Sequence, residues 1–116
     1  MVCGARRFVE RVGLDAARLA LVAQLVAQCP MLTRLSLRGN ALSGEAVAAV
    51  AAAVPVHAPL SFFDLEGNAV DAGCAAALAG LLEAHPTLTA LPLGDNELGD
   101  SGVKVIARAL VQPVLP

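Results

Sequence analysis

The chain has 116 residues, of which 57% are hydrophobic and 16% are charged, and its net charge is −2. This length suits a single domain, and so apolar a composition excludes a disordered chain. The small negative charge offers no general attraction for nucleic acid, so we expect no nucleic-acid partner.

Charge is spread unevenly along the chain. Residues 1–40 carry six arginines and two acids, whereas residues 41–116 carry two cations and eight acids. In so small a sample the asymmetry is either chance or the pattern of a dipolar molecule that associates head to tail.

Residues 1–13 contain no secretion signal, because their arginines are not followed by an apolar segment and a small-residue cleavage site. We interpret them as a degenerate N-terminal cap, which is either an irregular first strand or a short helix that ends at Gly13. The helix is favoured, with Phe8, Val9 and Val12 facing inward.

Four helices are predicted from apolar residues at helical spacing. The first spans residues 14–28, and Pro30 disfavours helical geometry in the residue before it. The others span about 44–54, 72–84 and 100–111, with Ser43 and Asp71 as N-caps of the second and third. The apolar run 46–56 is too short to cross a membrane, which takes about 20 residues, so we expect no membrane partner.

Three short strands are predicted at about 34–38, 62–66 and 90–94, where inward apolar residues alternate with others. The third contains Pro92, whose missing N–H confines it to a sheet edge. If the Pro92 nitrogen faces outward, this strand is a true edge. We expect one domain, 1–116, with repeats over 14–112 and a tail over 113–116.

One stretch recurs three times, 28 residues apart: L-T-R-L-S-L-R-G-N at 32–40, L-S-F-F-D-L-E-G-N at 60–68 and L-T-A-L-P-L-G-D-N at 88–96. Each copy precedes a helical pattern, so each unit is a strand, a turn and a returning helix. Such a unit buries its apolar face only by stacking on its neighbours. Each copy ends at an asparagine, Asn40, Asn68 or Asn96, whose carboxamide can satisfy backbone groups of the turn. We therefore interpret this column as structural.

The repeat resembles the leucine-rich repeat family, specifically its 28-residue ribonuclease-inhibitor-like type. The motif L-x-x-L-x-L-x-x-N-x-L is met by Leu32, Leu35, Leu37, Asn40 and Leu42; by Leu60, Phe63, Leu65, Asn68 and Val70; and by Leu88, Leu91, Leu93, Asn96 and Leu98. The resemblance implies an α/β fold, a right-handed βα solenoid. About three short parallel strands would line the concave side of the arc, and four helices the convex side.

In this fold the strand residues between the buried positions face the concave surface, and the resemblance implies that they contact a partner. The candidate binding residues are Arg34, Ser36, Arg38, Phe62, Asp64 and Glu66. Strand register would place Arg34 beside Phe62 and Arg38 beside Glu66. An exposed phenylalanine is unusual on a surface, so Phe62 is the preferred anchor, whereas the Arg38–Glu66 ion pair alone contributes little.

Cys29, His57 and His85 lie one repeat apart and are residue types that bind zinc. The next position in phase is Pro113, so there is no fourth ligand, and we expect no metal site. The odd count of three cysteines shows no disulfide spacing, which predicts a reducing, cytoplasmic location.

No phosphate-binding loop or nucleophile motif is present, and no catalytic residues are assigned. The resemblance implies a non-enzymatic module that binds another protein and needs no cofactor. One alternative is a GTPase-activating-type regulator, which would resemble the repeats of Ran GTPase-activating proteins. Another is a fragment of a larger NOD-like receptor array. Neither end of the chain carries a convincing polar cap, so self-stacking or continuation of a longer array is a further alternative.

Overall fold

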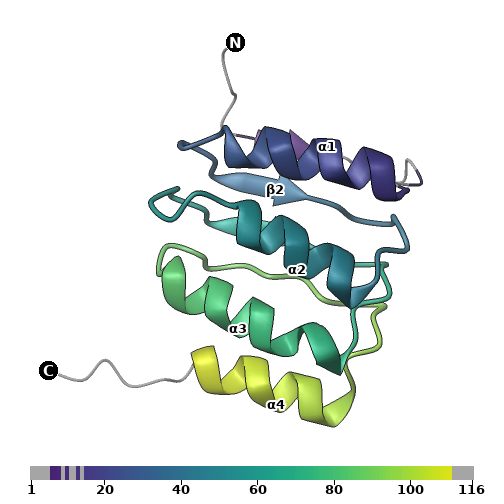
Figure 1. Cartoon of the computed structure of the whole chain (residues 1–116). Helices are drawn as coiled ribbons and strands as arrows, with labels where there is room; N and C mark the ends of the chain where they lie inside the picture. Colours follow the sequence, from purple (N-terminus) through teal and green to yellow (C-terminus); the bar gives the residue numbers. More distant parts are fainter. Residues whose placement is uncertain (1–5, 9, 11–12, 14, 111–116) are drawn as a thin grey trace, which may run out of the picture.

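The computed structural model describes residues 6–8, 10, 13 and 15–110. Its elements in chain order are β1 (Arg6–Phe8), α1 (Ala16–Ala27), β2 (Arg34–Ser36), α2 (Gly44–Ala53), β3 (Phe62–Asp64), the 3-10 helix η1 (Ala72–Cys74), α3 (Ala75–Ala84) and α4 (Gly99–Leu110). The α-helices form one layer, stacked in chain order from α1 to α4, and the strands lie behind them (Figure 1). The chain is thus an α/β protein with strands and helices in two layers.

The three strands form a parallel sheet in the order β1-β2-β3. Arg6 pairs with Arg34, and Arg34 pairs with Phe62, so each step across the sheet advances the chain by 28 residues. The period found in the sequence is therefore the register of the sheet. This confirms the prediction of stacked parallel strands with returning helices.

β1 is a strand, so the favoured prediction of a capping helix over residues 1–13 was wrong. A helix of this length forms few intrahelical hydrogen bonds. A strand in the same place pairs along three residues with β2, which would otherwise be an open edge. Val9 and Val12 lie outside the described residues, and so does the predicted tail.

The third predicted strand, 90–94, is reduced to an isolated bridge between Phe62 and Ala90. The amide of Leu65 donates to the Pro92 carbonyl at 3.0 Å. Because the N–H and C=O of one strand residue face the same neighbour, the Pro92 nitrogen also faces β3. In a regular ladder the N–H of residue 92 would donate to the Phe63 carbonyl, and proline has no such N–H. The Pro92 nitrogen therefore does not face the open edge of the sheet.

The core lies between the sheet and the helices and consists of the repeated apolar columns. Leu35 and Phe63 in the strands, and Leu37 and Leu65 directly after them, are fully buried. Val47, Val50, Ala75 and Leu78 meet them from α2 and α3. Burying about ten such side chains is the main term that stabilises the stack, at roughly 1.5–3 kcal/mol for each large one.

The turn after each strand requires a left-handed residue. Gly39 and Gly67 have φ of 71° and 72°, and Asp95 takes the same position in the third unit with φ of 54°. Such a backbone favours glycine, and Asp tolerates it better than most residues. The glycine in R-G-N (38–40) and E-G-N (66–68) indicates this left-handed position in the sequence, whereas the third unit reads G-D-N (94–96).

One of the two predicted helix caps is present. The Ser43 hydroxyl accepts from the amide of Ala46 at 3.2 Å, as expected for an N-cap. Asp71 makes no such bond, and the helix after it begins as η1. Its carboxylate instead lies against Gly44, where an added Cβ would come within 2.6 Å of Oδ1. Because Gly44 has no side chain, the Asp71 carboxylate can occupy this position.

Within the described residues no helix is both long and apolar enough to cross a membrane.

Candidate functional site: the exposed face of the sheet

The sheet has one face toward the helices and one face away from them, and we call the second the sheet face. Because neighbouring strand residues alternate in direction, Arg34, Ser36, Phe62 and Asp64 belong to the sheet face while Leu35 and Phe63 enter the core. Arg38 and Glu66 lie just beyond the C-terminal ends of the neighbouring strands β2 and β3. All six candidate residues are thus brought together.

Arg34 and Phe62 form a stacked pair. Their Cα atoms are register partners, and the guanidinium carbon of Arg34 lies 4.2 Å from the centre of the Phe62 ring. Both residues are partly exposed. In the part of the chain that the structure describes, the Arg34 guanidinium has no carboxylate partner. Stacking therefore holds the group in place while its N–H edges remain available.

Arg38 is in the opposite situation. Its guanidinium lies 2.8 Å from Oε2 of Glu66 and 3.8 Å from Oδ2 of Asp64. The Asp64 carboxylate also accepts from the amide of Glu66 at 2.9 Å. Two carboxylates thus compensate the charge of Arg38, so this end of the sheet face is neutral to negative, whereas the Arg34 end is positive.

Ser36 and Asp64 lie on the sheet face but are buried, which the alternation pattern did not predict. The Ser36 hydroxyl donates to the carboxylate of Glu10, and Asp64 is covered by Arg38 and Glu66. Glu10 was absent from the candidate set because it precedes the first clear repeat. Only the 28-residue phase, which places Glu10 in the column of Arg38 and Glu66, could have indicated it.

The column Cys29, His57 and His85 is divided between different environments. His85 is buried, and its Nδ1 lies 3.1 Å from the Ala58 carbonyl oxygen, so Nδ1 carries the proton and donates. His57 is exposed, and Cys29 is buried. Among the described residues no group of three or more His, Cys, Asp or Glu side chains could hold a metal ion.

The cysteines differ from the expectation of an unpaired set. Cys29 is disulfide-bonded, and Cys3 lies outside the described residues. The cytoplasmic location stays a prediction. Cys74 is free and buried in the helical layer, and burial, with a smaller contribution from the Asp71 charge, raises the pKa of its thiol.

The comparison with known families agrees with the geometry. Residues 28–51 and 84–107 match the family model described as Leucine Rich repeat. No curated protein matches the chain significantly. The two matched segments start 56 residues apart, which is two steps of the 28-residue register, and they contain the units of Asn40 and Asn96. The matches therefore show that these two segments are similar to leucine-rich repeats and lie in phase with the register of the sheet.

Proposed function

We propose that this chain is a non-enzymatic protein-binding module, a right-handed solenoid of the ribonuclease-inhibitor-like type whose concave side is the sheet face. The parallel sheet with a 28-residue register supports the subtype. The family match supports the general role, because leucine-rich repeats generally mediate binding between proteins.

The observation that carries the choice of surface is the Arg34–Phe62 pair. Arginine and aromatic residues dominate the energetics of protein interfaces. A guanidinium that is already stacked loses little conformational entropy on binding, and its N–H fork matches a carboxylate. The pair is therefore suited to a partner segment with an Asp or Glu beside an apolar residue. The apolar residue would cover the Phe62 ring.

Arg38 provides the internal contrast. A partner carboxylate that approached it would compete with Asp64 and Glu66, which already lie against its guanidinium. The two arginines are 4 residues apart on one face, yet only Arg34 has its donors available in the described structure. Charge alone would not distinguish them.

The test uses a displayed library of random peptides panned on the full chain, since no natural partner is identified. We expect the enriched peptides to share an acidic residue next to an apolar one. Their affinity should fall about tenfold or more for Arg34→Ala and Phe62→Ala, and less than about twofold for Arg38→Ala. Peptides without acids, or peptides that bind Arg34→Ala as well as the natural chain, would contradict the proposal.

A further inference from the structure

A hollow of about 300 Å³ lies in the helical layer between α2 and α3, which run side by side (Figure 1). Small residues of the two helices form most of its lining: Ala48, Ala51 and Ala52 from α2, and Ala77, Gly80 and Ala84 from α3. Of the described residues that line it, only His85 is polar, and none carries a carboxylate, an ammonium or a guanidinium group. The hollow is therefore an apolar space with a single polar side chain.

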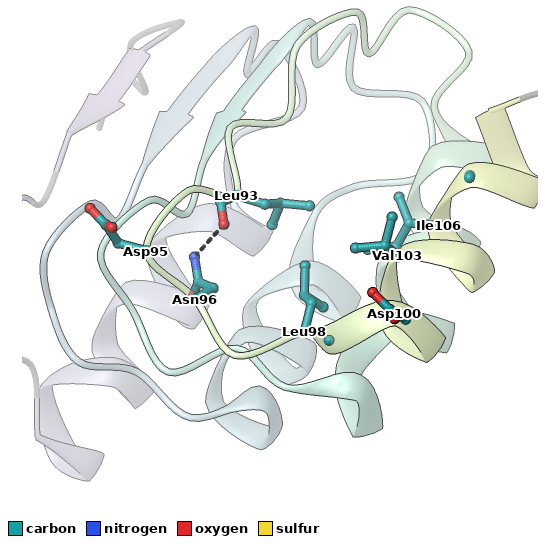
Figure 2. Close-up of a pocket in the computed structure, with 9 residues that line it drawn as sticks. Leu93, Asp95, Asn96, Leu98, Asp100, Val103 and Ile106 are labelled. Atoms are coloured by element: carbon teal, nitrogen blue, oxygen red, sulfur yellow. Dashed lines mark hydrogen bonds between the residues drawn. The ribbon is translucent and has the colours of Figure 1, made fainter.

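This hollow lies between two inner units of the stack. Another hollow, lined by Leu93, Leu98, Val103 and Ile106, lies beside α4 (Figure 2). That one borders the last described unit, and because residues 111–116 follow it outside the described part of the chain, its open side identifies no partner. The walls of the first hollow belong instead to α2 and α3, the inner pair of the four stacked helices.

The glycine of α3 leaves this space open. A Cβ added to Gly80 would meet nothing within 4 Å, whereas the nearest atom would lie at 2.6 Å for Gly44 in α2 and at 3.1 Å for Gly102 in α4. Close packing within the described chain thus explains the glycines of α2 and α4 but not that of α3. Because glycine inside a helix is less favourable than alanine, Gly80 weakens α3 while it leaves room beside it.

His85 supplies the polar group of the hollow. Only 3% of its surface is exposed, and its Nδ1 donates to the Ala58 carbonyl at 3.1 Å. A neutral imidazole protonated at Nδ1 keeps a lone pair at Nε2, which accepts hydrogen bonds. Among the described residues this Nε2 has no protein partner, although no fully enclosed side-chain nitrogen or oxygen there lacks one. Nε2 is therefore reached from open space, and the hollow is the space that His85 borders.

The chemistry of the hollow defines the class of its ligand. No described lining residue could compensate a charge, so a charged ligand would lose its hydration without replacement. The acceptor at Nε2 of His85 calls for one N–H or O–H donor. An apolar cavity of about 150 Å³ holds one benzene ring, so a hollow of about 300 Å³ suits a molecule of about two rings.

We propose that the hollow between α2 and α3 binds a small, uncharged, apolar molecule that carries one N–H or O–H donor. The apolar part of the ligand fills the space beside Gly80 and covers Val56, a lining residue that is 70% exposed. Its donor bonds Nε2 of His85 in place of water, so that no hydrogen bond is lost. This site is distinct from the sheet face and does not depend on the role proposed for it.

The test titrates the uniformly ¹⁵N-labelled full chain with indole and with benzofuran, which has the same ring shape but an oxygen in place of the N–H. We expect indole to bind with a Kd of about 1 mM or below and to shift the amides of Ala52, Gly80 and Ala84 but not that of Arg34. Indole should also move the ¹⁵N resonance of His85 Nε2. Benzofuran should bind about tenfold more weakly, because it brings no donor to Nε2.

Two matched variants test the position of the ligand. Ala52→Leu places a larger side chain in the hollow, whereas Ala49→Leu changes an exposed alanine of α2 that does not line it. Leucine and alanine are both good helix formers. We expect Ala52→Leu to weaken indole binding about tenfold or more, and Ala49→Leu to change it by less than about twofold.

His85→Asn tests the hydrogen bond itself. The asparagine amide keeps a donor for the Ala58 carbonyl but has no counterpart of Nε2, so this variant should bind indole and benzofuran about equally. Equal affinity of the natural chain for the two compounds, unchanged indole binding by Ala52→Leu, or no shift at about 10 mM indole would each overturn the proposal. Shifts at Ala52 and Gly80 that grow with chain concentration alone would also overturn it, because they identify a second copy as the occupant. The comparison of compounds in the natural chain remains decisive if His85→Asn does not fold.

Discussion

The carboxamide oxygen of Asn68 accepts a hydrogen bond from the backbone amide of Asn40, 28 residues earlier, at 3.1 Å. The same side chain also bonds the amide of Leu42 and the carbonyls of Leu37 and Leu65. One buried side chain therefore holds two successive turns together, which explains why the spacing of the asparagines equals the register of the strands.

We expect Asn68→Ala to lower the free energy of unfolding by about 3 kcal/mol, because it leaves several buried backbone groups without partners at about 1–3 kcal/mol each. Asn96→Ala should cost less, since Asn96 is partly exposed and water can replace some of its bonds. Urea denaturation of the two variants measures the difference. An equal loss for both would show that burial does not determine the effect.

Gly44→Ala should be destabilising by roughly 1–3 kcal/mol. The added Cβ would lie 2.6 Å from Oδ1 of Asp71 and 2.9 Å from Cβ of Cys74. The matched control is Gly80→Ala in α3, where nothing lies within 4 Å of the added atom. Because alanine is the better helix former, that change should stabilise by about 1 kcal/mol. Thermal unfolding of both variants tests the pair, and a stabilising Gly44→Ala would refute the close packing of the two units.

The contact between Arg34 and Phe62 should be measurable in the free chain. A double-mutant cycle with Arg34→Ala and Phe62→Leu is expected to give a coupling energy of about 0.5–1 kcal/mol, the size of an exposed cation–π contact. Chemical denaturation at low and high salt provides the values. A coupling near zero would mean that the stacked geometry is not populated in solution.

Cys74 should be unreactive in the folded chain. Its side chain is buried, and burial and the Asp71 charge raise the pKa of the thiol, so little thiolate is present at neutral pH. We expect its modification by a disulfide reagent to be slow without denaturant and fast in urea. Rapid modification of the native protein would show that η1 opens readily.

Much of the fold was predictable because each of the three copies of the repeat independently indicates the same strand, turn and helix. The spacing of Leu35, Phe63 and Leu91 determines the register, and Ser43 follows the ordinary rule for helix caps. The register also placed Arg34 beside Phe62. What the sequence pattern could not predict depends on contacts between units, and Asp71 shows this: its carboxylate turns toward Gly44 in the preceding unit instead of capping its own helix.

The candidate site was predictable in position but not in exposure. Alternation places Ser36 and Asp64 on the sheet face, yet their neighbours bury both. For Ser36 that neighbour is Glu10, which lies in a segment with no clear motif. To predict that the third strand is lost at Pro92, one must know which neighbour the Pro92 nitrogen faces. The apolar periodicity alone does not give that direction.

The most direct test of the sheet face as the binding surface is the location of a cross-link. The photoreactive residue p-benzoylphenylalanine would replace Phe62 in one variant and Leu21 in another; Leu21 lies on α1 in the helical layer and is 59% exposed. Each variant would be irradiated with the tightest peptide from the library selection. We predict a cross-link from position 62, reduced by Arg34→Glu, and none from position 21. A cross-link from position 21, or one from position 62 that Arg34→Glu leaves unchanged, would contradict the assignment.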